Sequence, residues 1–316
     1  MCRDFDIRYV KLHFTLRLSE DTELPIYKSS ALRGGMGEML LRANCISDRN
    51  CDACYFESEC IVRRTMYSKM EIEPGFMSKG DSVGYVLECE DYRTEFREGD
   101  ELCFNLILFG KTIVYFNQFL NAFYALGRNG LGKNHSHFEI ADVRNTLGKS
   151  LIRGQNIYMA DYEVTTVGDY VQYRLNQLAA DTGNLPESVA MRLQSPLAVK
   201  YQGAELLRLN PQALMNTVYR RIYILNCFEG IETNRYLPED FPLPDITEQD
   251  VRPSRVSRYS FRKEKKMTLQ GIEGTAQLDG LTKESLKLLL AGELVHIGKN
   301  TSFGFGRYYL KIVELL

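Results

Sequence analysis

The sequence predicts an α+β protein of two domains, each an antiparallel sheet covered on one face by helices. Three observations predict this class: a strictly alternating strand near the start, an order of strands and helices that recurs in the second half, and two similar glycine loops. The length of 316 residues also suits two domains, because one domain takes about 150 residues.

The first domain begins with an expected strand at residues 9–18. Its apolar residues, from Val10 to Leu18, share one face, and lysine, histidine and arginine share the other, which indicates a half-buried strand. The elements expected after it are a helix at 29–42, a strand at 103–109, a helix at 113–126 and a strand at 135–143. This order is typical of a ferredoxin-like sandwich.

The second domain repeats the theme. Pro196 ends a strand at 189–193, and Asn210 followed by Pro211 predicts the start of a helix. Residues 231–250 are rich in proline and acids and are expected to form a loop. Strands at 256–261 and 267–278, a helix from Thr282 to Ala291 and a strand at 308–313 complete the expected elements.

The two glycine loops predict an internal duplication. Gly130-Leu-Gly-Lys133 and Gly304-Phe-Gly-Arg307 each follow a helix and lead into a strand. We therefore expect an N-terminal domain at 1–147, with a cysteine-rich insertion at 44–62, and a C-terminal domain at 148–316, with its glycine-rich loop at 298–306.

Composition limits the classes of function. Hydrophobic residues make up 44% and charged residues 25%, as in globular proteins, and the net charge is −2. The start shows no signal peptide, and polar residues interrupt the most apolar stretch, so we expect no membrane span and a cytoplasmic location. In that compartment, the eight cysteines are expected to be free or bound to metal.

Four cysteines predict a metal site. Cys45, Cys51, Cys54 and Cys60 have C-x5-C-x2-C-x5-C spacing, and four thiolates can close a tetrahedral zinc site of structural type. An iron–sulfur cluster uses the same ligands and stays open as an alternative. The polar residues between the cysteines argue against four unrelated core thiols.

The glycine loops also predict contacts with phosphate. Gly127 to Lys133 nearly fits a nucleotide-hydrolase phosphate loop, but Asn134 stands where the magnesium-binding hydroxyl belongs, and a helix precedes the loop. Nucleotide hydrolysis is therefore excluded. Glycines still let backbone N–H groups approach an anion, and Lys133, Lys299 and Arg307 add charge. The alternative is a pair of tight turns that need positive φ.

A basic run at 251–266 predicts binding to nucleic acid. Tyr259 and Phe261 lie among its bases, and bases interleaved with aromatics suit RNA, whose phosphates need neutralising and whose bases stack. A solvated hairpin is the alternative. The expected contacts are Arg255, Arg258, Arg262, Lys263, Lys265 and Lys266, together with Lys133, His135, Lys299 and Arg307 near the glycine loops.

The chain has four histidines, and two are candidate bases for RNA cleavage without metal. Such cleavage needs a group near neutral pKa to activate a 2′-hydroxyl. His296, beside the second glycine loop, and His13, on the exposed face of the first strand, are the candidates. Tyr27 and Lys28, before the first helix, are expected to protonate the leaving oxygen or to stabilise the phosphorane.

These motifs together resemble a known family. His296 to Tyr309 resembles the C-terminal glycine-rich motif of RAMP proteins, and especially that of the CRISPR precursor-RNA processing endoribonucleases. Arg258-Tyr-Ser-x-Arg262 with Gly271-x-x-Gly274, Leu108-Phe-Gly110 and the loop ending at Lys133 fit the same family. One branch of it also carries a four-cysteine insertion after the first helix.

The resemblance implies tandem RRM-like domains, binding of a CRISPR repeat in precursor crRNA, and one cut inside that repeat. In the family's chemistry, the 2′-hydroxyl attacks the neighbouring phosphate without a metal ion and leaves a 2′,3′-cyclic phosphate. Members often place their histidine in or near the first helix, but residues 26–44 contain none, so that role does not transfer. His296, inside the matching motif, is the first expectation and His13 the second.

Two other functions compete with this one. The first is a RAMP subunit without nuclease activity that holds guide RNA in a CRISPR interference complex, which the missing helix histidine favours. The second is a metal-stabilised regulator that binds nucleic acid. Only the four cysteines favour such a regulator, and the sequence shows no recognition helix with clustered basic residues.

Overall fold

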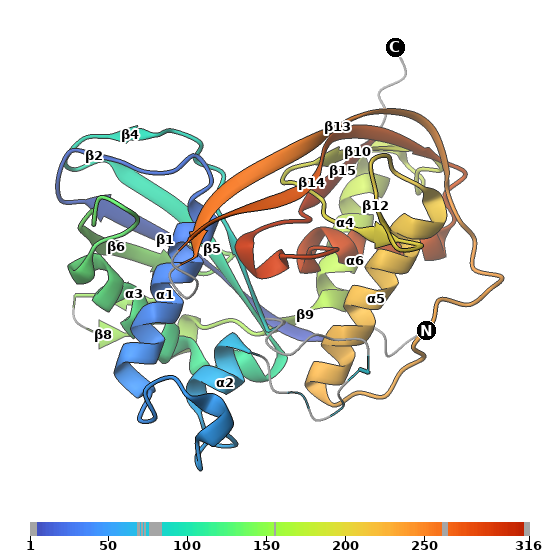
Figure 1. Cartoon of the computed structure of the whole chain (residues 1–316). Coiled ribbons are helices and arrows are strands. Elements are labelled where there is room, and N and C mark those ends of the chain that lie inside the picture. The colour runs from blue at the N-terminus through green and yellow to red at the C-terminus, as the bar shows by residue number, and fades with distance from the viewer. Residues whose placement is uncertain are drawn as a thin grey trace. The chain divides into compact units, whose positions relative to one another are not determined.

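The computed structural model describes residues 5–67, 70, 72, 74–75, 84–154, 156–260 and 265–312. The chain forms two compact units. Residues 9–164 and 258–267 make up the N-terminal unit, and residues 1–8, 165–257 and 268–316 make up the C-terminal unit. Figure 1 shows the chain with most of its helices and strands labelled.

The sheet of the N-terminal unit has the strand order β3-β5-β1-β6, with neighbouring strands antiparallel. Helices α1 and α3 pack against each other, with α3 also against β6 and α1 against β3. Together with the chain order β1-α1-β3-β5-α3-β6, this arrangement is a ferredoxin-like sandwich, as the sequence predicts. The bounds are β1 (Arg8–Leu18), α1 (Lys28–Asn44), β3 (Tyr85–Glu88), β5 (Glu101–Phe109), α3 (Phe116–Asn129) and β6 (Phe138–Arg144).

Shorter elements complete this unit. They are β2 (Thr22–Glu23), η1 (Cys51–Ala53), α2 (Ile61–Met66), β4 (Glu95–Phe96), η2 (Gly110–Tyr115), β7 (Ile152–Arg153), β8 (Asn156–Ile157) and η3 (Met159–Asp161).

The alternation of β1 builds the core of the N-terminal unit. Its apolar side chains are buried, and the ring of Phe14 stacks on that of Phe104 with centroids 4.9 Å apart. Phe123, from α3, contacts both rings. Because alternate residues of a strand face opposite sides of the sheet, burying this apolar set turns Lys11 and His13 to the other face.

The C-terminal unit repeats this topology. Its sheet has the order β13-β14-β10-β15, and the chain order is β10-α5-β13-β14-α6-β15. Corresponding strands therefore occupy corresponding places in both sheets, which confirms tandem ferredoxin-like folds. The bounds are β10 (Val189–Leu193), α5 (Pro211–Glu229), β13 (Asp245–Ser260), β14 (Lys265–Asp279), α6 (Lys283–Val295) and β15 (Tyr308–Ile312).

The expected helix starts of this unit are confirmed. The side chain of Asn210 accepts a hydrogen bond from the N–H of Ala213 at 3.0 Å, and Thr282 forms a capping box with Ser285. The unit also contains β9 (Thr165–Thr166), α4 (Val167–Thr182), β11 (Lys200–Tyr201), β12 (Ala204–Glu205) and η4 (Thr301–Phe303).

Some elements differ from the sequence-based expectation. The loop expected at 231–250 is shorter, because β13 already begins at Asp245. Strand β3 lies in an acidic stretch that carries no alternation, and all four of its residues are buried. Helix α4 was not expected, although Thr166 and Asp169 form a capping box at its start. Tertiary packing decides such segments more than local pattern does.

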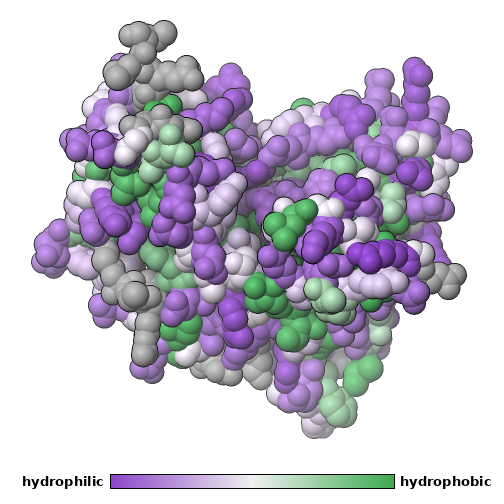
Figure 2. All heavy atoms as spheres, turned by 180° about the vertical axis from the view of Figure 1, so that it is seen from behind, coloured by the Kyte–Doolittle hydropathy of each residue, from purple (hydrophilic) through white to green (hydrophobic). Residues whose placement is uncertain are grey.

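Hydrophilic residues cover most of the face drawn in Figure 2, with hydrophobic ones in small groups among them. Within the described part of the chain, none of the helices combines the length and the apolar character that crossing a membrane requires.

A buried ion pair joins α4 to α6 in the C-terminal unit. Arg174 Nε donates to Glu293 Oε2 at 2.9 Å, and both side chains are almost fully buried. The other oxygen of Glu293 accepts from the backbone N–H of Leu310 at 2.6 Å, and the Tyr170 hydroxyl donates to the carboxylate. The hydrogen bonds of this carboxylate thus tie two helices to the last strand.

We predict that Arg174→Ala lowers the free energy of unfolding by about 3–5 kcal/mol, because it leaves a buried carboxylate without its cation. The matched control is Arg17→Ala, which breaks the exposed Arg17–Glu101 pair. That control should change the free energy by less than about 1 kcal/mol. Urea unfolding followed by circular dichroism checks both, and equal effects would contradict the prediction.

Candidate functional site

A row of polar side chains crosses the sheet of the N-terminal unit. Glu88 on β3, Asn105 on β5, His13 on β1 and Arg144 on β6 are successive cross-strand partners. Directly opposed residues of antiparallel strands project from the same face. The row therefore lies on the face that β1 turns away from the core formed by Phe14 and Phe104.

Hydrogen bonds connect three members of this row. Lys11 Nζ and Asn105 Nδ2 both donate to Glu88 Oε2, at 2.8 and 2.9 Å. The Oδ1 atom of Asn105 lies 3.0 Å from Nδ1 of His13. The carboxylate side chain of Glu88 is only 2% exposed, whereas His13 is exposed. A buried charge thus anchors one end of this hydrogen-bonded part of the row, and a solvent-accessible imidazole forms its other end.

Further charged groups surround His13. On β6, Arg144 donates to Asp142 at 2.5 Å, and the Ser150 hydroxyl donates to the other oxygen of Asp142 at 2.6 Å. Burial raises the pKa of Asp142, but these hydrogen bonds outweigh it, so the net direction is downward. Asp142 therefore stays ionised and Arg144 stays charged directly across from His13.

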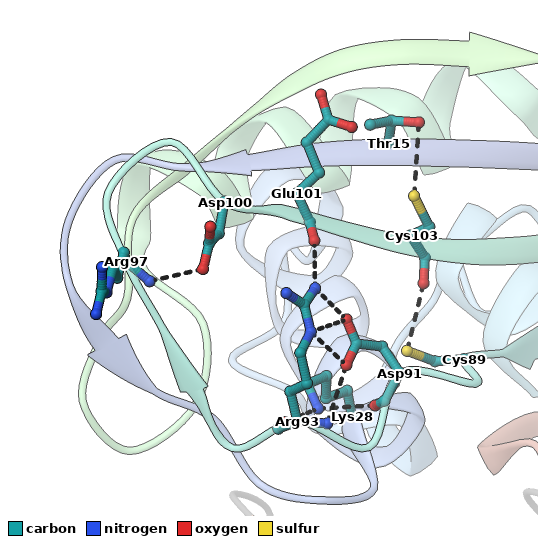
Figure 3. Close-up of polar contacts among 9 residues, drawn as sticks. All are labelled: Thr15, Lys28, Cys89, Asp91, Arg93, Arg97, Asp100, Glu101 and Cys103. Atoms are coloured by element: carbon teal, nitrogen blue, oxygen red, sulfur yellow. Dashed lines mark hydrogen bonds and ion pairs between the residues drawn. The ribbon is translucent and has the colours of Figure 1, made fainter.

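The structure places Lys28 inside the protein. Its side chain is 1% exposed, and Nζ donates to the backbone oxygens of Asp91 and Arg93 at 2.8 and 2.5 Å (Figure 3). It also lies over the ring of Phe96, and burial lowers its pKa. Lys28 thus fixes the segment before β4. Tyr27, one residue earlier, is half-buried, with its ring edge-on to another tyrosine ring.

Figure 3 also shows how the free thiols of this region are held. Cys103 donates to the hydroxyl of Thr15, and Cys89 donates to the backbone oxygen of Cys103. Burial raises the pKa of the Cys89 thiol to about 11. The thiol of Cys89 therefore stays protonated at neutral pH and is a poor nucleophile.

His296 is fully buried in the C-terminal unit. It follows the last residue of α6 with a φ of 55°, and its Nδ1 lies 3.0 Å from the backbone oxygen of Phe305. The ring thus braces the glycine-rich loop from within. A base for RNA must reach a 2′-hydroxyl, so this placement favours His13 over His296 and reverses the expected order.

The two glycine loops occupy corresponding places, between α3 and β6 and between α6 and β15. The backbone N–H of Gly130 donates to Leu126 O at 2.8 Å, and that of Gly306 donates to Pro196 O at 2.9 Å. A Cβ at Gly306 would lie 1.7 Å from the Ile297 oxygen. These glycines serve close backbone packing, which corrects the expectation that their N–H groups form a phosphate cradle.

Three basic residues of the C-terminal unit line one pocket of about 430 Å³. Arg255 and Lys299 line it, as expected contacts, and Lys200 joins them. All three residues are exposed, and the pocket lining also includes apolar residues such as Leu197 and Leu269. Three cations around an apolar surface suit a nucleotide, with its phosphate and its flat base.

The other expected RNA contacts are placed differently. Lys133 and His135 are exposed on the first glycine loop, and Arg307 is half-buried. Burial and the nearby Arg33 lower the pKa of Arg258. Arg262 and Lys263 lie outside the described residues, as do the side chains of Lys265 and Lys266.

The four cysteines of the expected metal site line one pocket of about 340 Å³, next to α2. The backbone N–H of Arg49 donates to Cys45 Sγ at 3.2 Å, and burial raises the pKa of Cys51. Their donor type and shared pocket suit zinc. Among the residues that the structure describes, however, no three metal-ligating side chains are grouped closely enough to hold an ion.

Comparisons with known proteins match each half of the chain to a family model. Residues 7–169 match a family model described as an N-terminal domain, and residues 191–308 match the model of the CRISPR-associated endoribonuclease Cas6. A protein of Archaeoglobus fulgidus is 21% identical over 293 residues, which cover 91% of this chain and 93% of that protein.

Solved structures share the fold. The chain matches two Cas6 product complexes with TM-scores of 0.53 and 0.52, at 16% and 14% identity, over 96% of this chain and 99% of those chains. It also matches a partial Cas6-RT-Cas1–Cas2 complex with a TM-score of 0.57 and 16% identity, over 98% of this chain. In this match, the present chain covers 48% of the other chain.

The fold defines a protein with tandem ferredoxin-like domains. Residues 191–308 match the Cas6 family of CRISPR-associated endoribonucleases, and the matched solved structures are those of Cas6 proteins.

Sequence reasoning found His13 but missed the residues that hold it. Lys11 was visible beside it on the same strand face. Asn105 and Glu88 are distant in the sequence, and only strand pairing brings them to His13. Lys200 was missed because a single lysine in a short hairpin carries no pattern.

We predict that Gly306→Ala destabilises the protein by about 1–3 kcal/mol more than Gly183→Ala. Both glycines have nearly the same φ, 75° and 78°, so both substitutions carry the same backbone strain. Only Gly306 has a backbone oxygen where the new Cβ would stand, whereas nothing lies within 4 Å at Gly183. Thermal unfolding of the two variants checks this. Equal losses of stability would show that the backbone near Ile297 moves to accommodate the new Cβ, and would contradict the prediction.

Proposed function

We propose that the protein binds CRISPR repeat RNA in precursor transcripts and cuts it within the repeat, with His13 as the general base. The observation that carries this proposal is the exposed imidazole of His13, hydrogen-bonded on a polar sheet face in a chain whose residues 191–308 match the Cas6 endoribonuclease model. We place this activity in the cytoplasm, with a CRISPR effector complex as a further partner.

The proposed chemistry needs no metal ion. Nε2 of His13 takes the proton of a 2′-hydroxyl, and the 2′-oxygen attacks the adjacent phosphorus. The bond from phosphorus to the 5′-oxygen breaks, and a protonated 5′-hydroxyl leaves behind a 2′,3′-cyclic phosphate. Arg144, the cross-strand partner of His13, supplies positive charge for the phosphorane. Half-buried Tyr27 stays the proposed acid, since Lys28 is committed to backbone oxygens.

The proposed RNA contacts follow the exposed cations. Lys200, Arg255 and Lys299 surround the pocket of the C-terminal unit, and Lys133 and His135 extend the first glycine loop. Each lysine or arginine that neutralises a phosphate releases counterions, so binding should weaken steeply with salt. Arg258, Arg262, Lys263, Lys265 and Lys266 of the basic run at 251–266 and Arg307 are proposed as further contacts.

End-labelled repeat RNA incubated with the protein in EDTA should yield a single cut with a cyclic-phosphate end. His13→Ala should slow this cut by roughly a hundredfold or more, because a general base contributes about 10²–10⁴ in rate. The matched control is His137→Ala, which removes another exposed histidine of the same unit, one paired with Glu20. Rates within about twofold of each other for the two variants would remove His13 from the mechanism.

The alternative function is an inactive RAMP subunit that holds guide RNA. The absence of a histidine from residues 26–44 favours it. Binding of the repeat without any cut, at every protein excess and with or without added divalent metal, would establish this alternative and overturn the nuclease.

We also propose that Cys45, Cys51, Cys54 and Cys60 bind one structural zinc ion, with an iron–sulfur cluster as the alternative. The support is their spacing and their shared pocket. Binding would draw the four thiolates together and tie the segment after α1 to α2, and it would supply folding free energy rather than catalysis.

Purified protein should contain about one zinc per chain, or iron with sulfide and a brown colour. Cys51→Ser should lose the metal, because three ligands hold zinc more weakly than four. Cys89→Ser, which changes a cysteine outside the cluster, should keep it. Metal-free protein with an unchanged melting temperature in chelator would remove this site.

A further inference from the structure

We propose that Asn105 and Glu88 are positioning residues that hold His13 in the tautomer with its proton on Nδ1, so that Nε2 is the basic nitrogen. This inference rests on the proposed role of His13 as the base. It adds two residues that neither touch RNA nor react, and it assigns them a specific task in the same site.

The argument begins at the carboxylate of Glu88. An ionised carboxylate has only acceptor atoms, so the atom of Asn105 that lies 2.9 Å from it must be the amino nitrogen. An amide that points its nitrogen one way points its oxygen the other way. The oxygen of Asn105 therefore faces Nδ1 of His13, at 3.0 Å.

The orientation of the amide then fixes the imidazole. An amide oxygen can only accept, so Nδ1 must carry a hydrogen for this contact to be a hydrogen bond. A neutral imidazole has one protonated nitrogen, which leaves the lone pair on Nε2. The nitrogen turned away from Asn105 is thus the one able to accept a proton from a 2′-hydroxyl. In hydrolases with a nucleophile and a base, a third group orients the base in a similar way.

The ionised state of Glu88 has a physical cause. Its side chain is 2% exposed, and a buried charge is tolerated only when it is paired and hydrogen-bonded. Lys11 supplies the pairing at 2.8 Å, from the same strand face as His13. Lys11 and Asn105 donate to the same carboxylate oxygen, so the cation sits beside the amide that orients the imidazole.

Polar and charged groups near His13 lie on its own strand and on the other strands of the sheet. On β1 they are Lys11 and Thr15, on β3 Glu88, on β5 Asn105 and Cys103, and on β6 Arg144 and Asp142. The charges of Lys11 with Glu88 and of Arg144 with Asp142 are internally balanced. A new charge at position 105 would have no such balance and should move the pH profile of cleavage.

The first experiment reads the tautomer without any activity. Long-range ¹H–¹⁵N correlation spectra of ¹⁵N-histidine-labelled protein distinguish the two nitrogens, and His13→Gln assigns the signal among the four histidines. Wild type should show protonated Nδ1 and basic Nε2 for His13 at high pH. Asn105→Ala should shift the ring toward protonated Nε2, and Asn105→Asp should retain Nδ1–H. Protonated Nε2 in wild type would overturn the inference.

The second experiment measures single-turnover cleavage against pH. Asn105→Ala should lower the plateau rate by roughly 10- to 100-fold with unchanged RNA affinity, as part of the 10²–10⁴ that a base contributes. Asn105→Asp should recover much of that loss, with its rising limb shifted to higher pH, because a carboxylate beside the ring favours the imidazolium. The control is Asn176→Ala, which changes an exposed asparagine of α4 in the C-terminal unit, and it should match wild type.

The outcomes separate this inference from the proposed function. If His13→Ala abolishes cleavage while Asn105→Ala and Glu88→Gln leave the rate and the tautomer unchanged, His13 is the base but the row does not position it. If His13→Ala cleaves at the wild-type rate, the proposed base fails, whatever the spectra show. A loss of rate in Asn105→Ala without a tautomer change would assign Asn105 a merely structural role.

Discussion

The pairing of β1 with β5 in one register is the constraint on which the polar face of the N-terminal unit depends. Because side chains alternate along a strand, a slip of one residue would turn Leu12 and Phe14 outward and bury His13. The stacking of Phe14 on Phe104 opposes such a slip, because this contact stabilises the core only in the observed register. The core thereby determines which groups meet on the opposite face.

The same unit of structure appears twice and is used differently each time. In the N-terminal unit, the sheet carries a buried carboxylate, an amide and an imidazole in one row. In the C-terminal unit, the buried ring of His296 packs inside the glycine-rich loop and lies 3.0 Å from the Phe305 oxygen. Lys200, Arg255 and Lys299 of this unit line a separate pocket. Duplication of a fold thus supplies two scaffolds, and the side chains on each decide what it does.

The glycine loops illustrate how a motif can be found correctly and explained wrongly. The sequence predicts that each loop follows a helix, and this position is confirmed: the first loop follows α3 and the second follows α6. The expected reason, backbone N–H groups offered to phosphate, is wrong for Gly130 and Gly306, whose N–H groups bond to protein oxygens. Gly130 and Gly306 are needed because another backbone segment approaches each of them too closely for a Cβ.

The sequence by itself determined the duplicated fold, the helix starts at Asn210 and Thr282, and the list of candidate bases. These follow from local patterns, because alternation, capping and glycine spacing act over a few residues. Only the tertiary structure decided that His296 and Lys28 are buried, and that Asn105 and Glu88 stand beside His13. Burial and strand register join residues that are distant along the chain, so neither can be read from one segment.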